Sequence, residues 1–161
     1  MVTNLVLTNL DYCNSILISA SDSAIRPLQI VLNKAIRFIL NLPKREHITP
    51  HAQNLHILPV KYRIKFKACV IAYRIYHRTS PQYLQEKYNT FVPTTTMKLR
   101  EARGRDPSMF VIEKPARERE TVDDRIKKEW NGLPMNIRLM PSITTFKTNL
   151  KTYFFGKAFL Q

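Results

Sequence analysis

The sequence predicts a mainly α-helical fold, with about six helices and one short β-hairpin. In several segments, apolar residues recur at the three- and four-residue spacing of one helix face. Only three glycines interrupt the 161 residues, and serines and prolines stand where helices are expected to begin. With 44% apolar residues, a chain of this length can bury a core as one helical domain, 1–161.

Residues 1–43 are expected to form an apolar helix pair. The first helix is predicted over 3–19, before a polar stretch. The second is amphipathic and ends near residue 42. We expect Ser23 to cap it and Pro27 to lie in its first turn, where a missing N–H costs little.

Residues 44–90 form a basic helical segment. A short helix is expected to start at Thr49, with proline following as its first helical residue. The principal helix is predicted from Pro59 to Arg78, apolar on two sides and basic along one stripe. A further short helix is expected over 82–88. The rings of the principal helix lie on a different face from its charges, which favours core packing for Tyr62, Phe66 and Tyr73.

Residues 91–120 are predicted to be a loop followed by a β-hairpin. The run Ser-Met-Phe-Val-Ile-Glu at 108–113 is expected to pair with residues near 116–119. Residues 121–161 then form the C-terminal helices. One helix starts at Thr121, a turn follows at Asn131-Gly132, and Ser142 caps the last helix.

The charge of the chain is strongly positive and unevenly distributed. Lysine and arginine number 26 against 12 acidic residues, a net charge of +14. Residues 41–80 carry eight basic residues and a single acid, Glu46, whereas residues 1–40 are nearly neutral. Such a patch suits a polyanionic partner such as nucleic acid or an anionic membrane surface. The alternative is a soluble domain that happens to be basic.

The basic stripe of the principal helix is the strongest functional signal. Arg63, Lys67, Arg74 and Arg78 lie within about 60° of one another at 3.6 residues per turn. Lysine and arginine supply most protein contacts to phosphate. We therefore predict sequence-independent binding of RNA or DNA, with six candidate binding residues: Lys61, Arg63, Lys65, Lys67, Arg74 and Arg78.

Motifs for catalysis are missing from the sequence. The three glycines cannot build a P-loop or a dinucleotide-binding fingerprint, and no nucleophile elbow occurs. His47, His51 and His56 are irregularly spaced and have no cysteine nearby, which does not favour zinc. The sequence therefore predicts no catalytic residue, no metal site and no cofactor.

Asp123 and Asp124 resemble a pair that could hold the metal ions of a polymerase. A second interpretation is a capping box, since Thr121 stands three residues before Asp124 at a helix start. Acidic side chains in a first helical turn also suit the helix dipole. The capping interpretation is favoured.

The expected location is intracellular, nuclear or cytoplasmic. Cys13 and Cys69 are far apart and form no paired motif, which is typical of a reduced protein. The N-terminus lacks the pattern of a signal peptide. No apolar run approaches the roughly 20 residues needed to cross a membrane, so no membrane partner is expected.

An ordered series of short stretches resembles the C-terminal region of LINE-type, non-LTR retrotransposon reverse transcriptases. The likeness covers nearly the whole chain, from about residue 10 to 159, and lies in the order of the stretches more than in any one of them. The stretches are LDYCNSIL (10–17), LQxVxNxAxR (28–37), HITP (47–50), LHxLPVKYRIxFK (55–67), PxYL (81–84), WNGLP (130–134) and SxxxFKxxLK (142–151).

The resemblance implies the thumb-side, post-catalytic part of such an enzyme, which would help to grip the RNA template and primed DNA. The catalytic palm and endonuclease regions are not found here, so no enzyme is expected, and the upstream reverse-transcriptase domain is a candidate partner. One departure is the highly charged stretch 118–129, which is more apolar in the family. Two alternatives stay open: an inactive relic, and a protein-interaction module that uses the apolar N-terminal helix.

Overall fold

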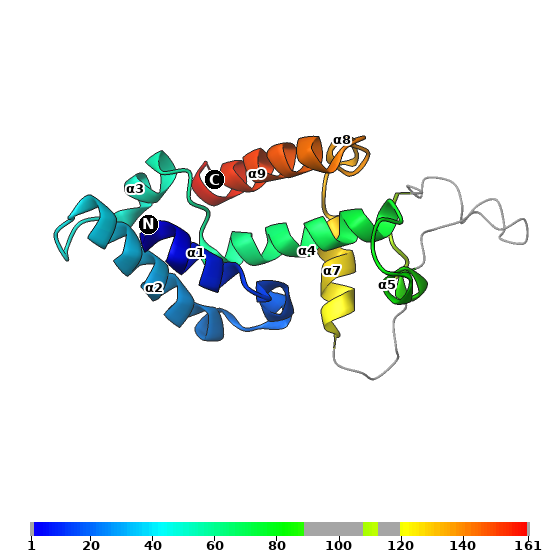
Figure 1. Ribbon diagram of the computed structural model, residues 1–161, viewed down its shortest axis with the longest axis horizontal. Helices are drawn as coiled ribbons and strands as arrows, with labels where there is room; N and C mark the ends of the chain where they lie inside the picture. The colour runs from blue at the N-terminus through cyan, green and yellow to red at the C-terminus, as the bar shows by residue number, and fades with distance from the viewer. Residues whose placement is uncertain (1, 89–107, 113–119, 161) are drawn as a thin grey trace, which may run out of the picture. The chain divides into compact units, whose positions relative to one another are not determined.

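The computed structural model describes residues 2–88, 108–112 and 120–160. Within them the chain forms nine helical segments and no strand, which confirms the mainly helical prediction (Figure 1). The segments, in chain order, are α1 (Val2–Asp11), η1 (Asn14–Ser19), α2 (Asp22–Leu40), α3 (Ile48–Asn54), α4 (Val60–Tyr76), α5 (Gln82–Lys87), α7 (Val122–Asn131), α8 (Met135–Arg138) and α9 (Ile143–Phe159).

The contacts of the chain define two compact units. The first consists of Met1–Lys67 together with Leu150–Gln161, and the second of Ala68–Asn149. The helices α4 and α9 each contribute residues to both units. The single helical domain expected from the sequence stays a prediction.

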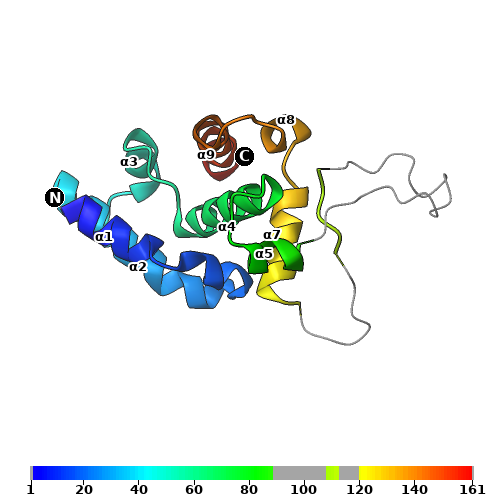
Figure 2. The same ribbon diagram turned by 45° about the vertical axis from the view of Figure 1, so that its right-hand side comes forward.

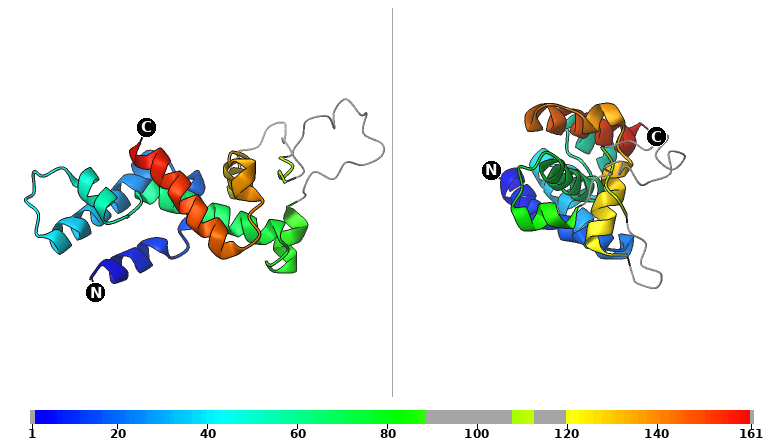
Figure 3. Two further views of the ribbon diagram at one scale, coloured as in Figure 1. Left: turned by 90° about the horizontal axis from the view of Figure 1, so that it is seen from above. Right: turned by 90° about the vertical axis from the view of Figure 1, so that its right-hand side faces the viewer.

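The first unit is built around α2. Helices α1 and α2 run side by side in opposite directions, as Figures 1 and 3 show. Apolar side chains from α2, α3 and the start of α4 form one buried cluster, onto which Leu7, Leu10 and Phe159 pack from the two ends of the chain. The buried members of this cluster are Ile25, Leu32, Ile36, Ile48, Ala52, Ile57, Val60 and Ile64.

The cap of α2 is Ser21, not Ser23. The Ser21 hydroxyl accepts a hydrogen bond from the amide of Ala24 at 3.4 Å, and the helix begins at Asp22. Pro27 therefore stands at the sixth helical position, beyond the first turn where it was expected. Because proline has no N–H, the carbonyl of Ser23 receives no helical hydrogen bond from this position. The C-cap residue Asn41 takes the left-handed conformation, with φ 50°, that asparagine tolerates well.

The helix predicted over 3–19 is broken in two. Cys13 has φ 50° and separates α1 from the 3-10 helix η1. Asn14, which is buried, donates its side-chain amide to the carboxylate of Asp11 at 3.3 Å. This bond links the end of α1 to the start of η1 across the left-handed residue Cys13.

Helix α3 begins earlier than Thr49-Pro50. His47 is its N-cap residue, and Ile48, the first helical residue, is buried in the cluster of the first unit. Pro50 is thus the third helical residue, where its missing N–H would have had no partner in the helix. The expected end of this helix is confirmed, since His56 follows with φ 52°.

The C-terminal part of α9 packs against the start of α4 within the first unit. The rings of Tyr62 and Phe154 lie 6.0 Å apart, and the Tyr62 hydroxyl donates to the carbonyl of Lys157 at 3.0 Å. His56 and Phe155 add a second ring contact at 5.5 Å. Tyr62 therefore stabilises the fold, in agreement with its expected structural role.

The second unit has an aromatic core around Trp130. This side chain is fully buried and lies 5.7 Å from the rings of Tyr76 and Phe110. Tyr73, which the sequence also assigned to the core, stacks on Phe146 with ring centroids 4.3 Å apart. Figure 2 shows α7, which carries Trp130, beside the short helix α5 of the same unit.

The expected β-hairpin is not confirmed. Residues 108–112 form no strand, and residues 113–119, which include the proposed second strand, lie outside the described part of the chain. The side-chain amide of Asn131 instead bonds both backbone groups of Phe110, accepting from its N–H and donating to its carbonyl at 2.9 Å each. The Asn131 carboxamide at the end of α7 thus ties the backbone of Phe110 to the second unit.

Candidate nucleic-acid interface

The principal basic helix forms where the sequence predicts it. The carbonyl of Pro59 accepts the amides of Tyr62 and Arg63 at 3.0 Å each, which begins α4. Of the six candidate residues, Lys61, Arg63, Lys65 and Lys67 belong to the first unit. The remaining two, Arg74 and Arg78, belong to the second unit, so the structure does not bring all six together in one unit.

Arg63 is held by a carboxylate of the same unit. Its guanidinium donates two hydrogen bonds to Asp11, from Nε at 2.9 Å and from a terminal nitrogen at 2.5 Å. Both side chains are largely buried, with 17% and 24% of their surfaces exposed. A bidentate pair in this geometry is strong and specific. The position of Arg63 is therefore set by Asp11, which the sequence did not predict as its partner.

Lys61 has an acidic partner as well, although at the surface. Its ammonium lies 2.9 Å from one oxygen of Asp22, and both side chains are more than half exposed. An exposed pair of this kind contributes little to stability. Lys61 can exchange Asp22 for a phosphate at small cost.

Arg78 is not on the basic stripe. Helix α4 ends at Tyr76, and Arg78 follows in the left-handed conformation with φ 53°. The amide of Thr79 then donates to the carbonyl of Arg74 at 2.8 Å, which closes the helix end in the manner of a C-cap motif. The expectation that Arg78 shares the helix face is thus wrong, whereas Arg74 lies on α4 and is exposed.

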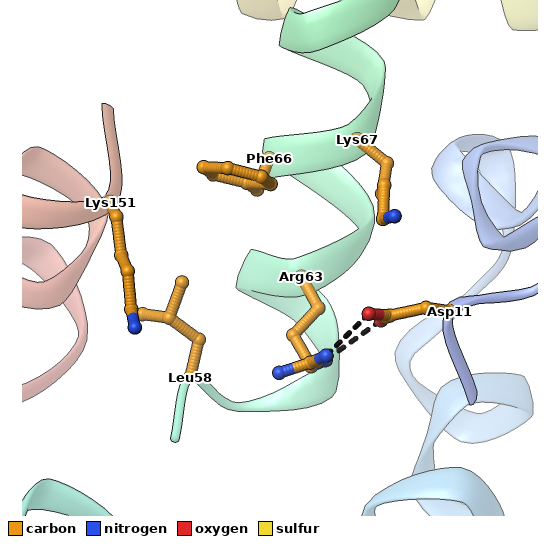
Figure 4. Close-up of a pocket in the computed structure, with 6 residues that line it drawn as sticks. All are labelled: Asp11, Leu58, Arg63, Phe66, Lys67 and Lys151. Atoms are coloured by element: carbon orange, nitrogen blue, oxygen red, sulfur yellow. Dashed lines mark hydrogen bonds and ion pairs between the residues drawn. The ribbon is translucent and has the colours of Figure 1, made fainter. Parts of the chain in front are cut away.

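A pocket in the first unit contains Lys67. Its volume is about 210 Å³, and it lies between α4, α9 and the end of α1. Figure 4 shows the ring of Phe66 between the side chains of Lys67 and Lys151, with Arg63 bonded to Asp11 below. The residues that line the pocket are Asp11, Leu58, Arg63, Phe66, Lys67 and Lys151.

The charge of the pocket is positive once its internal pair is considered. Arg63 and Asp11 neutralise each other through their bidentate bond. Lys67 and Lys151 remain, and neither ammonium has an ion-pair partner among the described residues. Lys67 is half-buried, where a charge is screened less than in open water. The arrangement favours an anion.

The first unit as a whole has the same bias. It contains eleven basic and three acidic residues, a formal charge of +8. Each of the three acids already has a nitrogen partner: Asp11 binds Arg63, Asp22 binds Lys61, and Glu46 lies 2.8 Å from His51. The acids of the unit are therefore outnumbered by its basic residues, and a net positive charge of this size attracts a polyanion.

Sequence reasoning missed Lys151 and Asp11 as parts of the site. Lys151 lies on the last helix and Asp11 at the end of the first, far from α4 in sequence. All six lining residues fall within the stretches 10–17, 55–67 and 142–151 quoted above.

The pair Asp123-Asp124 forms a helix cap, as expected. The hydroxyl of Thr121 accepts the amide of Asp124 at 3.2 Å, and the carboxylate of Asp124 accepts the amide of Thr121 at 3.2 Å. Asp123 instead accepts the hydroxyl of Tyr88 at 2.8 Å. The two carboxylates thus serve different local partners within the second unit, and the capping-box prediction is confirmed.

The cap gives a pH-dependent prediction. The Thr121 hydroxyl holds the pKa of Asp124 below its usual range, because it donates to the ionised carboxylate. A lowered folded-state pKa contributes stability above the unfolded value, and this is lost as pH falls through the folded value. Asp124→Ala should therefore cost about 1 kcal/mol at neutral pH.

The cost should shrink below about pH 4, near the usual pKa of an aspartate. Urea unfolding of both proteins across this pH range measures the difference. A constant difference from pH 7 to pH 2 would contradict an ionised cap.

The histidines do not gather into a metal site in the described part of the chain, where no group of three potential ligands is found. His51 pairs with Glu46, and His56 packs on Phe155. Neither cysteine forms a disulfide; Cys69 is buried and Cys13 is exposed. No helix in the described ranges has the length and apolar character of a membrane span.

The N-terminal helix, considered above as a protein-interaction surface, is partly used inside the first unit. Leu7 and Leu10 pack against the cluster around α2. Leu5, Tyr12 and Ile16 are exposed by 68%, 81% and 65%. Some of the apolar surface of this segment is thus covered and some is open.

Comparison with known proteins identifies no relative: no family model, no curated protein and no solved structure matches the chain.

Proposed function

We propose that the chain binds nucleic acid through phosphate contacts, without sequence preference and without catalysing a reaction. One observation carries the proposal: the first unit has eleven basic residues against three acids, and each acid is already bonded to a nitrogen within the unit. The unit can neutralise little of this charge by itself. A polymer of phosphates supplies the negative charge that the unit lacks.

Lysine side chains favour phosphate as the contact point. Lys67 and Lys151 present flexible ammonium groups, which bind phosphate as point charges and carry no information about the base sequence. Arg74 on the exposed surface of α4 is a further contact candidate in the second unit. We expect the affinities for RNA and for DNA duplexes to depend on salt concentration to a similar degree.

The resemblance to LINE-type reverse transcriptases supports the same function. All six residues that line the pocket belong to its matched stretches. A thumb-side region of such an enzyme would hold template and primer, so we propose this origin for the chain and the upstream reverse-transcriptase domain as a partner.

Salt dependence tests the proposal. Fluorescence anisotropy with a labelled DNA duplex and an RNA–DNA hybrid, over a series of KCl concentrations, should show log affinity falling linearly with log salt. Four phosphate contacts would give a slope of roughly −3 to −4. A parent protein that binds neither duplex at low salt, or a slope near zero, would refute nucleic-acid binding.

A double variant locates the contacts. Lys67→Gln with Arg74→Gln should reduce the slope by about two, because two counterion-releasing contacts are lost. Lys87→Gln with Lys128→Gln is the matched control: it removes the same charge from side chains that already pair with Asp123 and Glu120. An equal loss in both double variants would mean that net charge alone attracts the polymer.

A further inference from the structure

The pocket between α4 and α9 offers two kinds of surface at once. Lys67 and Lys151 stand at its rim as cations, whereas its wall is apolar, formed by Leu58 and Phe66 (Figure 4). Leu58 is buried with 4% of its surface exposed, and Phe66 is half-buried. A ligand that satisfies both surfaces carries an anionic group next to a flat apolar group.

The Arg63–Asp11 pair makes the pocket rigid at one side. Because both nitrogens of the guanidinium edge are bonded to the carboxylate, this wall is electrically neutral and its position is held. The anion is therefore directed to the two lysines and away from Asp11. Pre-organised walls of this kind reduce the ordering that a ligand must induce.

The volume indicates a part of a longer ligand. At about 210 Å³ the pocket is smaller than the roughly 300–1,000 Å³ of sites that enclose a whole small molecule. A single unit of a polymer, with the rest of the chain outside, fits this size better than a free cofactor. A base with its adjoining phosphate has the required combination of a flat face and a charge.

Only an unpaired base can reach the ring. In a duplex the bases are stacked and their faces are covered, so an aromatic side chain in a pocket has no access to them. A single strand can turn one base out of the stack and place it on an aromatic face. Phosphate contacts alone would not distinguish the two forms, whereas contact with Phe66 does.

We propose that this pocket binds one unpaired nucleotide of a single strand, with the base against Phe66 and Leu58 and the phosphates on its two sides at Lys67 and at Lys151. The inference rests on the proposed function and goes further, because it names the single strand as the form that the first unit prefers. The consequence is a preference for single strands over duplexes that depends on one aromatic ring.

The full-length chain tests this with two labelled probes: an unstructured twelve-nucleotide oligonucleotide and the corresponding blunt duplex. Phe66→Leu keeps an apolar side chain but removes the aromatic face. Its affinity for the single strand should fall about tenfold, in the range expected for one lost base–aromatic contact. Its affinity for the duplex should change by less than twofold.

Tyr83→Leu is the matched control, since Tyr83 is an aromatic residue of α5 that is 65% exposed and lies outside the pocket. It should leave both affinities unchanged. Lys151→Gln, at an exposed position, should weaken single-strand binding and reduce its salt slope by about 0.7. If far-ultraviolet circular dichroism shows that Phe66→Leu is unfolded, Lys151→Gln tests the pocket in its place.

The outcomes separate the two proposals. If the parent binds both probes and neither Phe66→Leu nor Lys151→Gln alters the preference between them, the pocket is not a nucleotide site, while phosphate binding stands. If the parent binds neither probe, the proposed function fails and the pocket proposal fails with it. A loss of single-strand affinity in Tyr83→Leu equal to that in Phe66→Leu would also overturn the assignment of the ring.

Discussion

Replacing Trp130 with alanine should lower the free energy of unfolding by about 3–5 kcal/mol, the typical cost of emptying a fully buried aromatic site. Trp130 has 0% of its surface exposed and lies among the rings of Tyr76, Phe110 and Phe146. Its indole N–H also donates to the carbonyl of Ser108 at 2.7 Å. Urea unfolding monitored by far-ultraviolet circular dichroism measures the loss, because the chain has no other tryptophan to serve as a fluorescent probe.

Two further variants separate packing from hydrogen bonding. Trp130→Phe keeps an aromatic ring but leaves the carbonyl of Ser108 without its donor, and should cost less than the alanine variant, about 1–3 kcal/mol for the unpaired buried group. Tyr12→Ala removes an aromatic side chain that is 81% exposed and should change stability by less than about 0.5 kcal/mol. Parent-like stability of Trp130→Ala would mean that the second unit does not fold around this ring.

Local patterns predicted most helices of the chain, and their limits explain where the prediction failed. Helix α7 with its capping box at Thr121, and α9 after Ser142, follow from caps and periodicity within one segment. The start of α2 was misplaced because Ser21 and Ser23 are both acceptable caps in sequence. The break at Cys13 lies in one residue with φ 50°, which the apolar periodicity of the segment does not reveal.

The segment 108–112 shows a second kind of limit. Its alternation of residues is that of a strand, but a strand needs a neighbour. Asn131 hydrogen-bonds both backbone groups of Phe110, and Trp130 and Arg138 donate to the carbonyl and the hydroxyl of Ser108. These partners lie 21 to 30 residues away, so only the tertiary structure reveals them.

Part of the candidate site could be predicted from the sequence. The basic stripe placed Lys67 and Arg74 on α4, since the helix period and the charge are both local to one segment. The partner of Arg63 could not be found in this way, because 52 residues separate it from Asp11. Charge counting treats every arginine as available, whereas pairing across the fold decides which of them is.

Arg63 can be interpreted as a structural residue or as a phosphate-contacting residue, and stability measurements distinguish the two. If Arg63 is a structural residue, Arg63→Met should destabilise the fold by about 2 kcal/mol, because Asp11 loses its partner in a largely buried position. Asp11→Ala should cost a similar amount. The double variant should cost less than the sum of the two, with a coupling energy of about 1–3 kcal/mol for residues in direct contact. Urea unfolding of all four proteins gives this cycle.

Binding measurements on the same four proteins test whether Arg63 contacts phosphate. Because the carboxylate of Asp11 already balances the charge of the guanidinium, Arg63→Met should change the salt slope of duplex binding by less than about half a unit, whereas a direct phosphate contact would be worth about 0.9. Asp11→Ala should bind duplex DNA more tightly than the parent despite its lower stability, since it releases Arg63 and removes one of the three acids of the first unit. An additive cycle together with a slope reduced by one unit in Arg63→Met would return this residue to the phosphate-contacting role that the sequence alone predicts.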